Sequence, residues 1–226
     1  MDDNERIATW VRKNKKRIAG ELIKHIPYPP NQSPTAIITA GLPGAGKTEF
    51  IRRLKSQLNI DSLHIDMDEI AKQIEGYRPQ IADKFRAGAS SIMNTILDSV
   101  LNKGIDYILD GTFGGSPALN NITRSLDHGY KIKIYYIYQE PLIAWRFTQA
   151  REKEEHRSIK KSGFINTYFK IYSNLSQLSQ FKHSVAFGVV IKNPDNQTGN
   201  VYDNVEDILQ LIPSKMTRIE LENLLT

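Results

Sequence analysis

The residues with the clearest chemical meaning lie between positions 41 and 49. The segment Gly41-Leu-Pro-Gly-Ala-Gly-Lys-Thr48 matches the pattern G-x-x-x-x-G-K-[ST], in which glycines let successive backbone N–H groups point at phosphate oxygens. A chance glycine turn is the alternative, but an apolar, β-branched run precedes the segment and helical spacing follows it, which is the context a phosphate loop requires. The positive N-terminal end of the following helix would also favour phosphate. We therefore predict a nucleotide site, with Lys47 on the β- and γ-phosphates and the Thr48 hydroxyl on Mg²⁺. The predicted nucleotide contacts are Gly41, Leu42, Pro43, Gly44, Ala45, Gly46, Lys47, Thr48 and Glu49.

Acidic residues follow two further predicted strands. Asp66 and Asp68 end the strand at 62–66, and Asp110 ends the strand at 105–109, just before Thr112. Parallel strands end at one edge of a sheet, so these side chains should lie near the phosphate loop. Either early aspartate could take the proton of an acceptor hydroxyl, and one could instead cap the helix that begins near residue 68. Asp110 could bind acceptor hydroxyls, hold Mg²⁺ through water, or only serve a turn.

Arginines gather in a charge-dense stretch after the strand at 130–138. Arg146, Arg151 and Arg157 lie where small P-loop kinases close a lid over ATP, and arginines there neutralise charge on the transferring group. The alternative is an ordinary solvated helix end, because charge runs are usually surface. His64 and His156 lack partners at metal-ligand spacing, so we expect them to be supporting polar residues.

The other uses of a phosphate loop fit the chain less well. A GTPase would need the guanine-binding element N-K-x-D after a late strand, where this chain has Lys192-Asn-Pro-Asp195. A motor ATPase would need paired acids after an apolar strand, where Asp110 is followed by glycine. A small phosphotransferase remains the interpretation that the residues favour.

Short apolar runs alternate with segments of helical spacing, which indicates an α/β fold. We predict a doubly wound, mostly parallel sheet with helices on both faces and a helical lid. The expected strands are 35–40, 62–66, 105–109, 130–138 and 184–191, and the expected helices are 4–26, 47–58, 81–102, 116–128, 141–153, 163–180, a segment around 208–212, and 216–225. Four prolines between residues 27 and 34 predict a linker, so residues 1–30 form an N-terminal helix with a linker and residues 31–226 form the main domain.

The amino-acid composition limits the cellular compartments and the kinds of partner that fit this chain. The 226 residues contain no cysteine, which excludes a disulfide framework and a thiol nucleophile. The start is acidic, without the order of a signal peptide, and apolar stretches are too short to span a membrane. We expect a cytoplasmic protein with no membrane partner. The net charge of +5 suits an anionic ligand and is too small to indicate nucleic-acid binding.

Four segments together resemble the zeta toxin family of P-loop kinases. They are residues 33–48, His64-Ile-Asp-Met-Asp-Glu-Ile70, Leu109-Asp-Gly-Thr112, and Arg151 with His156-Arg157-Ser-Ile159. The resemblance covers about residues 33–180 and implies ATP- and Mg²⁺-dependent phosphorylation of a hydroxyl. Well-known members phosphorylate UDP-N-acetylglucosamine, which poisons cell-wall synthesis, and an antitoxin protein is the partner that the resemblance implies.

The resemblance also implies roles at individual positions. Lys47 and Thr48 would bind phosphates and Mg²⁺, and Asp68 would be the catalytic base. Arg151 and Arg157 would contact the γ-phosphate. The residues expected to bind the acceptor are Asp66, Asp68, Asn94, Asp110 and Thr112. Two of them depart from the family, because Asp110 stands where it has glutamate and Asn94 stands where the toxins have a sugar-binding glutamate.

Three functions follow from these residues. The first is a zeta-type toxin that phosphorylates a small molecule, such as a UDP-amino sugar. The second is a metabolic or antibiotic-modifying phosphotransferase acting on a sugar, nucleoside or drug, which Asn94 motivates. The third is a nucleotide-dependent RNA-binding module, which the basic N-terminal helix motivates but which lacks an interleaved aromatic stacking platform.

Overall fold

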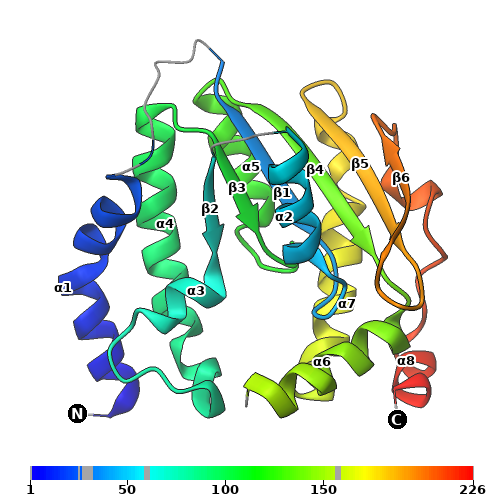
Figure 1. The fold of residues 1–226 in the computed structure, drawn as a ribbon, viewed down its shortest axis with the longest axis horizontal. Coiled ribbons are helices and arrows are strands. Elements are labelled where there is room, and N and C mark those ends of the chain that lie inside the picture. Colours follow the sequence, from blue (N-terminus) through cyan, green and yellow to red (C-terminus); the bar gives the residue numbers. More distant parts are fainter. Residues whose placement is uncertain (1, 25, 27–32, 59–61, 156–158, 226) are drawn as a thin grey trace.

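A single six-stranded sheet organises the chain (Figure 1). The computed structural model describes residues 2–24, 26, 33–58, 62–155 and 159–225. The strands are β1 (Thr35–Ala40), β2 (Leu63–Asp66), β3 (Tyr107–Asp110), β4 (Lys131–Tyr138), β5 (Val185–Lys192) and β6 (Thr198–Asp203), in the order β2-β3-β1-β4-β5-β6. The first five strands run parallel to one another, and β6 runs antiparallel to β5. The predicted α/β fold with a mostly parallel sheet is confirmed.

Helices cover both faces of this sheet. Figure 1 shows α2 in front of it and α5 and α7 behind it. The α-helices are α1 (Asp3–Ile23), α2 (Lys47–Leu58), α3 (Met67–Lys72), α4 (Arg86–Lys103), α5 (Ala118–Asp127), α6 (Pro141–Glu155), α7 (Lys161–Leu175) and α8 (Arg218–Leu224). None of the helices in the described part of the chain is both long enough and apolar enough to cross a membrane.

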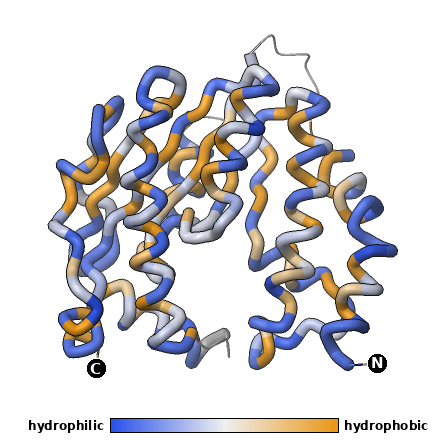
Figure 2. The backbone as a smooth tube through the Cα atoms, turned by 180° about the vertical axis from the view of Figure 1, so that it is seen from behind, coloured by the Kyte–Doolittle hydropathy of each residue, from blue (hydrophilic) through white to orange (hydrophobic). Residues whose placement is uncertain are grey.

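The core lies between the sheet and its helices, and apolar stretches of the backbone line it in Figure 2. The last five residues of β1 are buried, as expected for a central strand covered on both faces. Two of the buried tyrosines bond their hydroxyls across elements. Tyr130 donates to the carbonyl oxygens of Val100 and Ile105, both at 2.9 Å. Tyr107 shares a bond of 2.6 Å with the Ser125 hydroxyl. These bonds tie the start of β3 to α5, and the residue before β4 to α4 and to the segment before β3.

The N-terminal helix packs against α4. Its apolar face, including Ile7 and Val11, belongs to the same hydrophobic core as the sheet. Gly88 of α4 allows the close approach, because a Cβ there would lie 3.0 Å from Val11 Cγ2 and 3.3 Å from Ile7 Cγ2. The predicted division at residue 30 stays a prediction, and residues 27–32 of the linker lie outside the described residues.

Several elements differ from expectation. The helix expected over 163–180 ends as α7 at Leu175 and is followed by a separate 3₁₀ helix, Leu178–Phe181. The helix expected over 81–102 begins as a 3₁₀ helix, Pro79–Phe85, with non-helical Ile81, and becomes α-helical at Arg86. The segment around 208–212 forms only a 3₁₀ turn, Ile208–Gln210, shortly before Pro213, which cannot continue a helix. The sequence interpretation missed β6, whose turn from β5 places Asn196 in the left-handed region at φ 64°. The polar run 193–197 was its signal.

Candidate nucleotide and acceptor site

The phosphate loop is the turn between β1 and α2, where β1 ends and α2 begins at Lys47. Gly44 has a φ of 79°, and a Cβ there would lie 2.1 Å from the Ala144 carbonyl oxygen on α6, so only glycine fits. Lys47 Nζ folds over the loop and donates to the carbonyl oxygens of Gly41 (3.1 Å) and Leu42 (2.7 Å). A glycine loop that opens into a helix N-terminus fits the polyphosphate of ATP.

Charged residues that the sequence analysis predicted separately surround Lys47. Burial lowers the pKa of Lys47 to about 8, the carboxylates of Asp110, Asp68 and Asp66 oppose this decrease, and the Arg151 guanidinium adds to it. Residues from the ends of β2 and β3, from α3 and from α6 therefore lie within electrostatic reach of the phosphate loop. The fold thus assembles at one edge of the sheet what the sequence scatters over about a hundred positions.

Asp110 is only 6% exposed, and its carboxylate contacts three other side chains of the site. Its Oδ2 accepts a hydrogen bond from the Thr48 hydroxyl (2.9 Å) and lies 3.3 Å from His64 Nε2, and its Oδ1 accepts one from the Thr39 hydroxyl (3.3 Å). Burial acts to raise the pKa of Asp110, but the bond with His64, the charge of Lys47 and the bond from Thr48 together hold it below its usual value. The carboxylate is therefore ionised beside the Thr48 hydroxyl.

This arrangement fits a divalent cation bound with a nucleotide. Mg²⁺ prefers oxygen ligands and keeps several waters when it binds phosphates, and Thr48 and Asp110 supply oxygens next to the phosphate loop. Ligand atoms of His64, Asp66 and Asp110 also lie within 4.8 Å of one another. Thr48 would hold the ion directly, with Asp110 beside it.

The two aspartates after β2 have different surroundings. Asp66 Oδ1 accepts the backbone N–H of Asp68 at 2.7 Å and caps α3. Burial raises the pKa of Asp66, the neighbouring carboxylates of Asp68 and Asp110 act in the same direction, and the bond from the Asp68 backbone opposes the increase. Asp68 lies half-buried in the first turn of α3. The helix cap that the sequence left open between the two therefore falls on Asp66.

The two remaining predicted acceptor residues, Thr112 and Asn94, differ in their contact with the phosphate loop. Thr112 follows β3, and its carbonyl oxygen accepts the N–H of Gly41, the first residue of the phosphate loop, at 3.1 Å. Asn94 is half-buried on α4, and none of the hydrogen bonds among described residues joins it to the other predicted site residues. The fold brings Thr112, and not Asn94, into contact with the phosphate loop.

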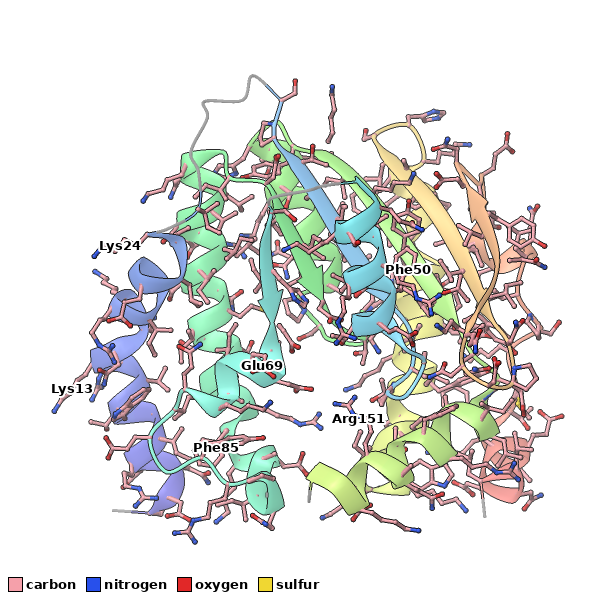
Figure 3. The ribbon with its side chains drawn as sticks, in the orientation of Figure 1. Lys13, Lys24, Phe50, Glu69, Phe85 and Arg151 are labelled. Carbon is pink, nitrogen blue, oxygen red and sulfur yellow. The ribbon has the colours of Figure 1, made fainter. Side chains whose placement is uncertain are left out.

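The predicted lid arginines lie on and after α6. Arg151 is exposed near the end of α6, on the same side of the sheet as α3 with its Glu69 (Figure 3). Arg146 is exposed one turn earlier. Arg157 and His156 lie outside the described residues. Of the two arginines expected at the γ-phosphate, Arg151 is therefore the one that the structure places.

Sequence reasoning missed three residues that contact the site. Thr39 bonds Asp110, and its signal was a polar residue inside the apolar run Ile37-Ile38-Thr39-Ala40. Asn196, in the turn after β5, donates from Nδ2 to the carbonyl oxygen of Gly44 (3.3 Å). Lys192 has a fully buried side chain whose ammonium lies 3.8 Å from Glu49 Oε2 and has no hydrogen-bond partner among the described residues. No sequence signal marked Asn196 or Lys192, because both reach the loop from a distant strand end.

A mostly parallel sheet with helices on both faces and the phosphate loop after a central strand defines the chain as a P-loop kinase-like protein. The family model described as Zeta toxin matches residues 20–207. The chain belongs to the zeta toxin family, and this confirms the resemblance that the four sequence segments carry. A search of curated proteins found no match in sequence.

Solved structures agree with this assignment at the level of the fold. One is described as the PezAT chromosomal toxin–antitoxin system of Streptococcus pneumoniae; it is 16% identical, with a TM-score of 0.69, over 96% of this chain and 91% of that chain. The AvrRxo1-ORF1:-ORF2 complex is 13% identical with a TM-score of 0.54, over 87% of this chain and 64% of that chain. A structure of that complex with ATP gives the same identity and TM-score, over 88% and 64%.

Proposed function

We propose that this chain is an ATP- and Mg²⁺-dependent kinase that transfers the γ-phosphoryl group to a hydroxyl of a small molecule. The observation that carries the proposal is the bond between Asp110 and Thr48 beside Lys47, with Asp68 and Arg151 within electrostatic reach. A phosphate loop alone would serve any nucleotide-binding protein. The added carboxylate and guanidinium are what a phosphotransferase needs.

The residues divide the reaction among them. Lys47 exchanges the carbonyl oxygens of Gly41 and Leu42 for phosphate oxygens, and bound Mg²⁺ would neutralise phosphate charge. Asp68 accepts the proton of the acceptor hydroxyl while the hydroxyl oxygen bonds to the γ-phosphorus. The bond from that phosphorus to the β–γ bridging oxygen breaks, and ADP leaves. Arg151 stabilises the negative charge on the transferring group.

We further propose that the acceptor is a UDP-amino sugar and that the chain acts as the toxin of a toxin–antitoxin pair. Membership of the zeta toxin family and the fold shared with the PezAT structure support this. Asn94 in place of the sugar-binding glutamate favours a second candidate, a phosphotransferase with another sugar, nucleoside or drug as acceptor. An antitoxin is the partner expected under the first candidate only.

The test of the kinase is transfer from ATP into an extract of small metabolites, followed by mass spectrometry for species that gain one phosphoryl group. We expect such a species with the wild type, and its identity separates the two acceptor candidates. Asp68→Asn should abolish transfer while ATP still binds. Asp127→Asn is the matched control, because Asp127 is exposed at the end of α5, next to the start of β4 and so at the opposite edge of the sheet. Normal turnover of Asp68→Asn would overturn the assignment of the base.

The test of toxicity is inducible expression in bacteria. Growth arrest by the wild type that Lys47→Ala removes would support a toxin, because it would depend on the phosphate loop. Unaffected growth at equal protein levels would favour the metabolic or resistance role.

A further inference from the structure

The loop that follows β3, residues 111–115, lies between the phosphate loop and α7. The loop is joined to the phosphate loop by the Thr112 carbonyl oxygen, which accepts the N–H of Gly41. The Thr112 hydroxyl accepts the N–H of Gly114 at 3.2 Å. The conformation of this loop therefore decides where the hydroxyl of a proposed acceptor-binding residue lies relative to the phosphates.

This loop contains a backbone conformation that its sequence does not favour. Phe113 has a φ of 62°, in the left-handed region, and is buried. The other non-glycine residues with positive φ in the described part of the chain are Asn196 and Asn204, and asparagine tolerates that region. A bulky residue stays there only when its surroundings hold it, and such strain gathers at functional sites.

The surroundings that hold Phe113 come from α7. Asn174 Nδ2 donates to the Phe113 carbonyl oxygen at 2.7 Å and to the Gly115 carbonyl oxygen at 3.3 Å. Two turns earlier on the same helix, Thr167 packs so closely that a Cβ on Gly114 would lie 3.3 Å from its Cγ2. One amide group thus bonds two carbonyl oxygens on the C-terminal side of the strained residue, across 61 and 59 residues of sequence.

We infer that Asn174 is a positioning residue for the acceptor: by bonding the carbonyls of Phe113 and Gly115 it holds the strained loop that presents Thr112. Without these bonds the left-handed conformation at Phe113 loses its support, the loop relaxes, and the Thr112 hydroxyl leaves its place. The inference rests on the proposed function and on the acceptor-binding role that the resemblance to zeta toxins implies for Thr112. Asn174 bonds carbonyls that follow Phe113, whereas the bond from the Thr112 carbonyl to Gly41 of the phosphate loop precedes it. The loss of Asn174 should therefore affect the acceptor much more than ATP.

The experiment compares Asn174→Leu, which keeps the size of the side chain and removes its donors, with the wild type. The donor is γ-labelled ATP and the acceptor probe is the small-metabolite extract, used as a dilution series. We expect Asn174→Leu to need about tenfold more extract for half-maximal transfer, while the half-saturating ATP concentration changes less than twofold. Hydrogen exchange in the peptide that spans residues 111–115 should also become faster.

Controls separate this role from a general loss of structure. Asn166→Leu makes the same chemical change on α7 at an amide that bonds Arg218 instead, and both saturation constants should stay within twofold. Asn174→Asp keeps the shape but turns an acceptor oxygen toward the carbonyls, so it should act in the same direction as Asn174→Leu.

Three other results have separate meanings. If Thr112→Ala weakens use of the extract and Asn174→Leu does not, the positioning role is wrong and the proposed acceptor site stands. If Thr112→Ala itself leaves use of the extract unchanged while the wild type phosphorylates it, Thr112 does not bind the acceptor and the positioning role is wrong, but the proposed kinase stands. If the wild type phosphorylates nothing in the extract, the proposed function fails.

Discussion

The pKa of Lys47 makes ATP affinity a function of pH that can be worked out in advance. In the free protein, burial brings this pKa to about 8. A bound polyphosphate supplies opposite charge and should return the pKa to at least the ordinary value of 10.5. The protein that binds ATP is therefore the protonated form, and its population falls as the pH rises through 8.

The magnitude follows from these two values. Between pH 7.5 and pH 9.0 the apparent Kd for ATP should rise about eightfold, which corresponds to about 1.2 kcal/mol. At pH 8.5 about three quarters of Lys47 is neutral before binding, so each binding event should take up about 0.75 of a proton. Both numbers come from one group, so they must agree with each other.

Isothermal titration calorimetry measures both quantities. Titrations with ATP in EDTA exclude divalent cations, and buffers of different ionisation enthalpy report the proton uptake. Lys47→Arg is the matched control, because a guanidinium stays charged through this range and should bind ATP with little dependence on pH. A wild-type affinity that stays flat from pH 7.5 to 9.0, with no proton uptake, would show that Lys47 is already charged in its buried position, and the argument from burial would fail.

Three further predictions concern the site and the fold. Asp110→Asn removes the charge beside Thr48 and should lower kcat by a factor of about 10² or more, while ATP affinity in EDTA is kept or improved; Mg²⁺-dependent turnover checks this. Lys192→Met removes a buried charge with only a distant partner and should raise the free energy of unfolding in urea by about 1–2 kcal/mol at pH 7. Because burial lowers the pKa of Lys192, the gain should shrink as the pH rises through the lowered pKa and vanish only above 10.5, where the wild-type side chain is neutral in the folded and the unfolded state. Gly88→Ala should lower the free energy of unfolding by about 1 kcal/mol despite better helix propensity, since the new Cβ would press on Val11; stabilisation in a urea titration would contradict the packing of α1 on α4.

Local patterns predicted much of this protein. The segment around Lys47 can be predicted from local sequence, because the glycines of the turn, the start of the helix and the phosphate-binding residues all lie within about ten positions. The bounds of β1 and α2 therefore follow their prediction residue by residue. The order of the first five strands and of the helices between them also follows from periodicity, since these elements show their apolar spacing along the chain.

What the sequence alone left open, and what only the tertiary structure decided, are relations between residues that lie far apart in the chain. The cap of α3 could have been either aspartate, and the geometry at the end of β2 assigns it to Asp66. Asp110 meets Thr48 across 62 positions, and Asn174 meets Phe113 across 61. Such contacts depend on strand order and on helix packing against a loop, which leave no periodic signal in the sequence. The sequence by itself thus determined the phosphate chemistry, and the tertiary structure decided which side chains surround it.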